Sequence, residues 1–178
     1  MTPIPKPPIH PPVRQLRPTG AVLAVGSNLG DREASIRAGL AALPFHGVTV
    51  TAVSTLIESV AVKPEGEDES APRYLNGVAL VRTALAPREL LRVVQSIESE
   101  FGRVRAERWG DRTLDIDIVA YGSLVLETDD LVIPHPRAAE RSFVLAPWLE
   151  VDPRAELPGA GPVAWLLDAL PEQAGNAS

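Results

Sequence analysis

Residues 103–121 read RVRAERWGDRTLDIDIVAY, and the second half of this stretch has the two-residue alternation of a β-strand. Leu114, Ile116 and Ile118 fall on one face of that strand, and Asp115 and Asp117 fall on the other. The α-carbons of the two aspartates lie roughly 6 to 7 Å apart on the rise of a strand. Parallel carboxylates at that separation repel each other unless a cation lies between them, so the strand predicts a cation site.

The chemistry of this carboxylate pair favours magnesium bound together with phosphate. Mg²⁺ takes hard oxygen ligands, usually one or two carboxylates and the phosphates of a substrate. The first half of the stretch supplies arginines at 103, 105, 108 and 112, on a chain of net charge -6, and guanidinium forks match phosphate oxygens. We therefore expect a polyphosphate to be held here with two Mg²⁺ ions. The alternative from these residues alone is an edge strand with a solvated polar face beside an incidental arginine cluster.

The composition predicts a cytoplasmic, globular protein that acts on small molecules. The chain has 178 residues, 45% of them hydrophobic, and no cysteine, which fits one core in a reducing compartment. No apolar run approaches the ~20 residues of a membrane helix, and the N-terminus lacks the apolar core of a signal peptide, so we expect no membrane partner. The acidic balance, with pI ≈ 5.1, argues against a nucleic-acid partner. We expect a monomer.

Proline marks one end of the expected domain. Residues 1–19 are rich in proline, which withholds backbone donors and favours extended shapes, so we expect a disordered tail there. We expect residues 20–171 to form the single domain and residues 172–178 to fray.

The hydrophobic pattern predicts strands and helices in the order β, α, β, β, α, β. Strands are expected over residues 21–25, 48–57, 74–83 and the aspartate stretch. Helices are expected after an N-cap at Asp31 and over Pro87 to Phe101. This order predicts an α+β fold of ferredoxin-like arrangement, with a mainly antiparallel sheet, helices packed on it and a small C-terminal β/α appendage.

The remaining segments carry weaker signals. Residues 58–73 hold prolines, glycine and acids and are expected to form a long polar loop. Residues 124–127, LVLE, are expected to form a short strand. Residues 161–170 are expected to form an amphipathic helix whose Trp165 and Leu166 cover an apolar patch.

Two further groups of side chains suggest a binding pocket. Tyr74 and Asn76 share a face of their strand, where a ring can stack on a flat heterocycle and an amide can bind its edge. The alternative is a strand-end tyrosine beside a turn-forming asparagine. His135, Arg141 and Phe143 fall within nine residues, and they suit a phosphate site, although a histidine between prolines can also simply rigidify a turn.

Four segments together resemble one enzyme family. AVGSNLGDR, YLNGVALV, QSIESEFGRVRAERWGDRTLDIDI and IPHPRAAERSFVLAPW are similar to the 6-hydroxymethyl-7,8-dihydropterin pyrophosphokinases of the folate pathway, over roughly residues 21–158. The resemblance implies transfer of pyrophosphate from ATP to the hydroxymethyl oxygen of the pterin, with release of AMP. No strong general base is evident, and Asp117 is a candidate only if it is not fully committed to metal.

The resemblance also implies roles for single residues. It assigns Asp115 and Asp117 to two Mg²⁺ ions that bridge the ATP phosphates. It assigns Arg103, Arg112 and Trp109 to a lid loop that closes over the triphosphate.

Binding residues follow from the same resemblance. The implied pterin pocket contains Tyr74, Asn76 and Phe143. The implied nucleotide contacts are Gln95, Glu98, His135 and Arg141, with Leu114, Ile118 and Ile133 lining the adenine pocket by analogy.

Two departures from the family pattern affect these expectations. Asp111 stands where the family usually has proline, which predicts a looser lid and a weaker grip on ATP. Residues 58–73 lack the Thr-Pro pattern expected there, so we assign no pterin contacts to them.

Two other classes of protein share part of the pattern. A palm-like metal nucleotidyltransferase would have the aspartate pair on an α+β sheet, but it would not need the Tyr74, Asn76 and Phe143 pocket. An RNA-binding ferredoxin-like module would need exposed aromatic side chains and a basic face on its central strands, whereas this strand carries acids.

Overall fold

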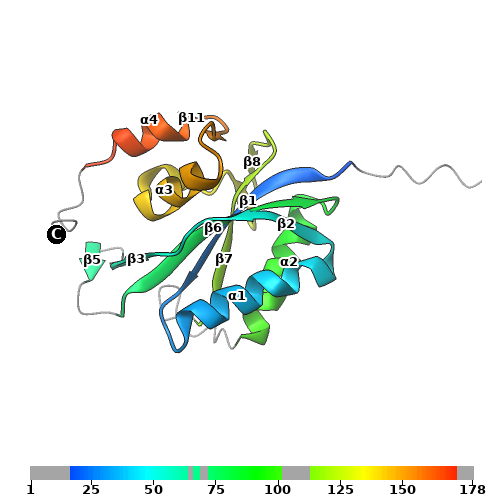
Figure 1. The fold of residues 1–178 in the computed structure, drawn as a ribbon. Helices are drawn as coiled ribbons and strands as arrows, with labels where there is room; N and C mark the ends of the chain where they lie inside the picture. The colour runs from blue at the N-terminus through cyan, green and yellow to red at the C-terminus, as the bar shows by residue number, and fades with distance from the viewer. Residues whose placement is uncertain (1–16, 64–65, 69–71, 102–112, 172–178) are drawn as a thin grey trace, which may run out of the picture.

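The computed structural model describes residues 17–63, 66–68, 72–101 and 113–171. Its centre is an antiparallel sheet with the strand order β2-β6-β1-β7 (Figure 1). The four strands are β1 (Thr19–Ser27), β2 (Val48–Val53), β6 (Tyr74–Thr83) and β7 (Asp115–Tyr121). Helix α1 (Arg32–Ala42) connects β1 to β2, and helix α2 (Pro87–Glu100) connects β6 to β7. This is the ferredoxin-like arrangement, and the predicted fold class is confirmed.

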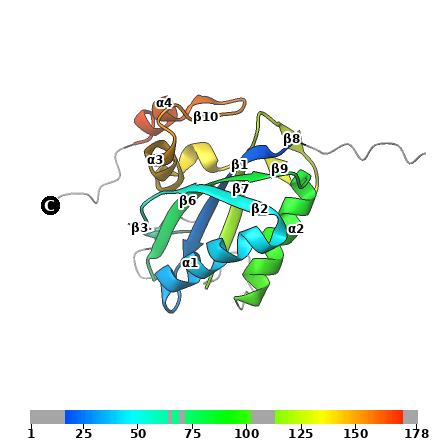
Figure 2. The same cartoon turned by 45° about the vertical axis from the view of Figure 1, so that its right-hand side comes forward.

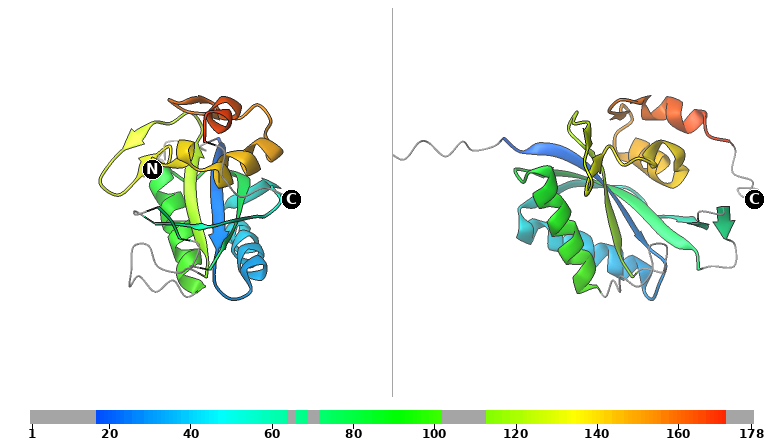
Figure 3. Two further views of the ribbon diagram at one scale, coloured as in Figure 1. Left: turned by 90° about the vertical axis from the view of Figure 1, so that its left-hand side faces the viewer. Right: turned by 180° about the vertical axis from the view of Figure 1, so that it is seen from behind.

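The sheet lies between two layers of helices (Figure 2). Helices α1 and α2 cover one face, and helix α3 (Ser142–Val151) covers the other, with α4 (Val163–Asp168) packed against α3 (Figure 3). The alternation of β1 supplies both cores: Leu23 and Val25 pack with α1 and α2, whereas Val22 packs with Trp148 of α3. No helix in the described ranges is long and apolar enough to cross a bilayer.

The two sheet-covering helices begin where the sequence predicts. The side chain of Asp31 caps α1 by accepting a hydrogen bond from the Ala34 N–H over 3.0 Å. At the start of α2, the Glu89 carboxylate accepts a hydrogen bond from the Ala86 N–H over 2.7 Å. Both helices are thereby fixed at their N-terminal ends.

The single strand expected over residues 48–57 is wrong. Strand β2 ends at Val53, and a separate strand β3 (Ile57–Ser59) pairs with the first residues of β6. Ser54 causes the interruption, because its hydroxyl, in place of a strand carbonyl, accepts the hydrogen bond from the Val78 N–H over 2.9 Å.

The long loop expected over residues 58–73 is also corrected. Its first residues belong to β3, and a hairpin of β4 (Ala61–Lys63) and β5 (Gly66–Asp68) follows. A polar sequence can form this hairpin because the pairing is made by backbone groups.

The C-terminal segment is built from short elements around α3. These are β8 (Leu126–Glu127), β9 (Val132–Ile133), η2 (Ala138–Glu140), β10 (Glu156–Leu157) and β11 (Gly161–Pro162). Strand β8 is half the length expected for LVLE. Helix α3 was not predicted, because its sequence, SFVLAPWLEV, is apolar on all sides and contains Pro147.

The last helix is shorter than expected, and the prediction for its tryptophan is wrong. Val163, Leu166 and Leu167 form the inward face of α4, with the three- and four-residue spacing of a helix. Trp165 projects from the opposite side and is 73% exposed.

Candidate functional site

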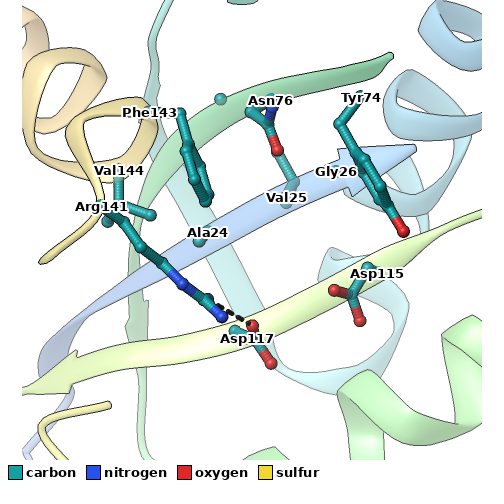
Figure 4. Close-up of a pocket in the computed structure, with 11 residues that line it drawn as sticks. Ala24, Val25, Gly26, Tyr74, Asn76, Asp115, Asp117, Arg141, Phe143 and Val144 are labelled. Atoms are coloured by element: carbon teal, nitrogen blue, oxygen red, sulfur yellow. Dashed lines mark ion pairs between the residues drawn. The ribbon is translucent and has the colours of Figure 1, made fainter. Parts of the chain in front are cut away.

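A cavity opens on the sheet face that carries α3 (Figure 4). We call it the aromatic cavity. Side chains from β6, β7 and the start of α3 surround it, and β1 forms its floor. Its lining consists of Ala24, Val25, Gly26, Tyr74, Asn76, Gly77, Asp115, Asp117, Arg141, Phe143 and Val144.

The floor of the aromatic cavity exists because β1 carries small residues at two successive positions of this face. Gly26 pairs with Asn76 on one side and with Asp115 on the other, and Ala24 pairs with Asp117. The central strand therefore leaves room between the amide of β6 and the carboxylates of β7.

Asp117 has two basic side chains beside it. Its Oδ2 lies 3.6 Å from Arg141 Nη1 and 3.7 Å from His135 Nε2. The Asp117 side chain is 35% exposed, so the carboxylate can be reached from solvent. Asp115 and Asp117 face the same side of β7, as the alternation predicts (Figure 4).

His135 is neutral near pH 7 and presents one defined donor. Burial lowers the pKa of His135 to about 4, and the neighbouring positive charge of Arg141 contributes to this shift. Nδ1 of His135 accepts a hydrogen bond from the Arg137 N–H over 3.1 Å. The neutral ring therefore carries its proton on Nε2, the atom that faces Asp117.

Arg141 and Phe143 enter the aromatic cavity together from the start of α3. The Arg141 guanidinium lies 5.7 Å from the centre of the Phe143 ring, a distance at which a cation and a ring attract. Burial lowers the pKa of Arg141, but an arginine remains charged at neutral pH. The cavity therefore holds a fixed positive charge beside Asp117.

A second hollow lies beside Asp117. We call it the outer cavity. It is formed by α2, β7 and the turn between β8 and β9. Its lining consists of Leu91, Ile116, Asp117, Ile118, Thr128, Asp129, Asp130, Leu131, Val132, His135 and Pro136. Asp117 lines both cavities. Two molecules, one in each cavity, would therefore meet at this carboxylate.

The structure brings most of the predicted site residues together. Six of them line the aromatic cavity: Tyr74, Asn76, Asp115, Asp117, Arg141 and Phe143. Ile118 and His135 line the outer cavity with Asp117. Arg103, Trp109 and Arg112, the predicted lid residues, and Asp111 lie outside the described residues.

Four predicted residues in the described ranges line neither cavity. Leu114 is buried in the core, where its side chain fills the space over Gly39 of α1. Ile133 is buried in the same core. Gln95 is half-buried on α2. Glu98 is 1% exposed, and its Oε1 accepts a hydrogen bond from the Ile116 N–H, between the two aspartates, over 2.9 Å.

Sequence reasoning also missed residues that shape the cavities, among them Ser59, Thr128 and Asp130. Ser59 Oγ accepts a hydrogen bond from Asn76 Nδ2 over 2.8 Å, which turns Asn76 Oδ1 toward Gly26. Thr128 and Asp130 shape the rim of the outer cavity. The pairing of β3 with β6 is non-local, so a sequence pattern gives no signal for Ser59. For the rim of the outer cavity, the acidic residues 129 and 130 are the feature that the sequence offers.

The donor set for a metal consists of two carboxylates. Within the described ranges, no group of three or more His, Asp or Glu side chains is arranged to hold an ion. Two hard oxygen donors on one strand face are nevertheless what Mg²⁺ needs when a substrate supplies phosphate oxygens and water completes the coordination. Asp115 and Asp117 therefore fit a substrate-borne magnesium ion.

Sequence comparison matches the chain to one family of enzymes. Residues 22–153 match the family described as 7,8-dihydro-6-hydroxymethylpterin-pyrophosphokinase (HPPK). The chain is 45% identical over 137 residues to a 2-amino-4-hydroxy-6-hydroxymethyldihydropteridine pyrophosphokinase of Bacillus subtilis, covering 76% of this chain and 80% of the relative. It is 41% identical over 150 residues to the Pseudomonas aeruginosa protein of the same name, covering 84% and 90%.

Structure comparison gives the same fold. The crystal structure of wild-type Plasmodium falciparum HPPK-DHPS superposes with a TM-score of 0.63 at 14% identity. The match covers 88% of this chain and 42% of that longer chain. At this identity the likeness shows the fold alone.

Proposed function

We propose, on the premise that this chain belongs to the 7,8-dihydro-6-hydroxymethylpterin-pyrophosphokinase family, that its two cavities hold the two substrates of one reaction. That reaction transfers pyrophosphate from ATP to 6-hydroxymethyl-7,8-dihydropterin, which gives AMP and the pterin diphosphate for folate biosynthesis. The position of Asp117 on the wall of both cavities is the observation that carries the proposal.

The pterin occupies the aromatic cavity in this proposal. Tyr74 and Phe143 lie on either side of Asn76 (Figure 4), so a flat bicycle could be held between rings while an amide binds its edge. Because Asn76 Nδ2 is engaged with Ser59, the group that Asn76 turns toward the cavity is its carbonyl oxygen. Asn76 therefore accepts hydrogen bonds from the N–H groups of the pterin.

ATP occupies the outer cavity. Ile118 and Leu131 give it an apolar side suited to a purine, and His135 lies at its junction with the aromatic cavity. Leu114 is not part of this proposal, because it fills the core beside α1. The triphosphate then extends toward Asp117 and the hydroxyl group of the pterin.

Asp115 and Asp117 would hold the magnesium that accompanies ATP, with two ions as the sequence predicts. When bound, Mg²⁺ neutralises phosphate charge and orients the polyphosphate. The chain's own contribution is positioning and charge. Arg141 stabilises negative charge on the transferred group, and the Nε2–H of His135 donates to a phosphate oxygen. Burial keeps His135 neutral, so it acts as a hydrogen-bond donor near pH 7.

The family activity accounts for the site better than the two alternatives. A nucleotidyltransferase or an RNA-binding module would leave the Tyr74, Asn76 and Phe143 pocket without a use. We propose that the protein is a cytoplasmic enzyme that acts on small molecules as a monomer, without a nucleic-acid partner.

The test is AMP formation from ATP and 6-hydroxymethyl-7,8-dihydropterin. We expect AMP and pterin diphosphate in equal amounts when Mg²⁺ is present, and no product with excess EDTA. Release of free pyrophosphate from ATP would favour a nucleotidyltransferase. AMP that forms equally well without the pterin would overturn the proposal.

A further inference from the structure

Arg32, the first residue of α1, connects that helix to both strands that lead into the aromatic cavity. Its Nη2 lies 2.7 Å from Oε1 of Glu58 on β3. Its Nη1 donates to the carbonyl oxygen of Arg73 over 2.9 Å. One guanidinium therefore holds two segments that are far apart in the sequence.

One acceptor directly precedes a residue that lines the aromatic cavity, and the other precedes a residue that orients one. Glu58 precedes Ser59, which pairs with Tyr74 and accepts the hydrogen bond from the Asn76 amide. Arg73 precedes Tyr74, the first residue of β6. A shift of either acceptor would therefore move Tyr74 or turn the amide of Asn76.

This corner of the sheet benefits from an added anchor. Strand β3 has three residues, and in the described part of the chain it pairs with β6 alone. Short edge strands open locally at a small free-energy cost. The helix end that carries Arg32 is itself fixed by the Asp31 cap. A guanidinium suits the task because its donors have a fixed planar geometry and can engage two acceptors at once.

We propose that Arg32 is a positioning residue for the pterin. By holding Glu58 and the Arg73 carbonyl, it fixes Tyr74 and Asn76 in the arrangement that binds the bicycle. This inference rests on the proposed function, which assigns the pterin to the aromatic cavity. Arg32 does not line that cavity, so its effect is exerted through β3 and β6.

The energetics predict a local effect. The Arg32 and Glu58 side chains are 31% and 49% exposed, and exposed ion pairs contribute little to global stability. Loss of Arg32 should therefore leave the melting temperature almost unchanged while it loosens the β3–β6 corner. A merely structural role would change stability without distinguishing between the two substrates.

The matched experiment compares Arg32→Met with Arg37→Met. Arg37 lies on the same helix and pairs with Glu33 of that helix, so its loss removes an exposed ion pair without touching β3 or β6. We would measure KM for each substrate and amide hydrogen exchange at residues 57–59 and 74–76. For Arg32→Met we expect the KM of the pterin to rise about threefold to tenfold, the KM of ATP to stay unchanged, and exchange at these amides to accelerate. Arg37→Met should match the wild type, and Arg32→Lys should recover part of the loss.

The two readouts separate this inference from the proposed function. Unchanged exchange in Arg32→Met, or faster exchange with an unchanged pterin KM, would overturn the positioning role. Equal increases in the KM of both substrates would also overturn it. If the wild type makes no AMP, the proposed function fails, and with it the pterin assignment. The exchange measurement then still decides whether Arg32 anchors the corner.

Discussion

Asn76 and Asp115 lie opposite the same residue, Gly26, on the two strands that flank β1. An amide acceptor and a carboxylate are thus separated by a strand position without a side chain. A Cβ at position 26 would lie 3.1 Å from Asn76 Oδ1 and 3.8 Å from the Tyr74 ring. The space between the pterin-binding side chains and the aspartate pair therefore depends on this glycine.

Gly26→Ala should impair pterin binding while the protein still folds. The added methyl group would occupy the floor of the aromatic cavity, and a misplaced methyl-sized group in a pocket changes kcat/KM by about tenfold or more. Steady-state AMP formation at varied pterin concentration measures this effect. The control is Gly20→Ala on the same strand, where a Cβ would meet nothing within 4 Å. Equal kinetics for the two variants would show that Gly26 does not shape the pocket.

Asp115→Asn and Asp117→Asn should each remove most of the turnover. Amides are weaker magnesium ligands than carboxylates, and loss of one charge-stabilising group in a catalytic site costs about a hundredfold in kcat or more. Asp117→Asn also removes the partner of Arg141. The Mg²⁺ dependence of AMP formation, together with thermal unfolding, measures both effects. Asp168→Asn, an exposed carboxyl group on α4 that lines neither cavity, is the control. Wild-type rates in either site variant would contradict the metal assignment.

Arg88→Met should weaken ATP binding without affecting the pterin. Arg88, near the start of α2, donates from Nη2 and Nε to Asp130 over 2.9 to 3.3 Å. Asp130 in turn accepts a hydrogen bond from Thr128, so α2 holds the turn that lines the outer cavity. We expect the KM of ATP to rise about threefold, the size of an exposed ion pair. Arg92→Met, one turn further along α2, serves as the control. A rise in the KM of the pterin instead would contradict the assignment of ATP to this cavity.

Local patterns predicted the parts of the site that one element supplies. The alternation of β7 placed Asp115 and Asp117 on one face, and the same period placed Tyr74 with Asn76 on β6. It also placed Leu114 and Ile118 on the core face, yet only Ile118 lines a cavity. The difference is tertiary: among the strands of the described ranges β7 lies at the edge of the sheet, and its open side faces the outer cavity, whereas Leu114 lies over Gly39 of α1.

Contacts between distant segments could not be predicted from the sequence. The pairing of β3 with β6 gives Ser59 its hydrogen bond to Asn76, and an interruption at Ser54 separates β3 from β2. Helix α3 lacks the amphipathic period that identifies helices, because both α4 and the sheet cover it. Arg141 and Phe143 were therefore predicted as site residues without prediction of α3, which begins between them.

Glu150→Gln should reduce the acid sensitivity of the fold. The Glu150 carboxylate of α3 accepts hydrogen bonds from the N–H and hydroxyl groups of Thr55, between β2 and β3, over 2.7 to 3.1 Å. These donors lower the pKa of Glu150 below its ordinary value of 4.5. A carboxyl group whose pKa is lowered by folding contributes stability that is complete above the ordinary value and is lost as the pH falls through the lowered one. Between pH 6 and pH 3 the melting temperature of the wild type should therefore fall further than that of Glu150→Gln, by about one to a few degrees. Glu156→Gln, an exposed carboxyl group on β10, should follow the wild type. If the melting temperatures of the wild type and of Glu150→Gln fall equally from pH 6 to pH 3, the contact between Thr55 and Glu150 does not hold α3 to the sheet.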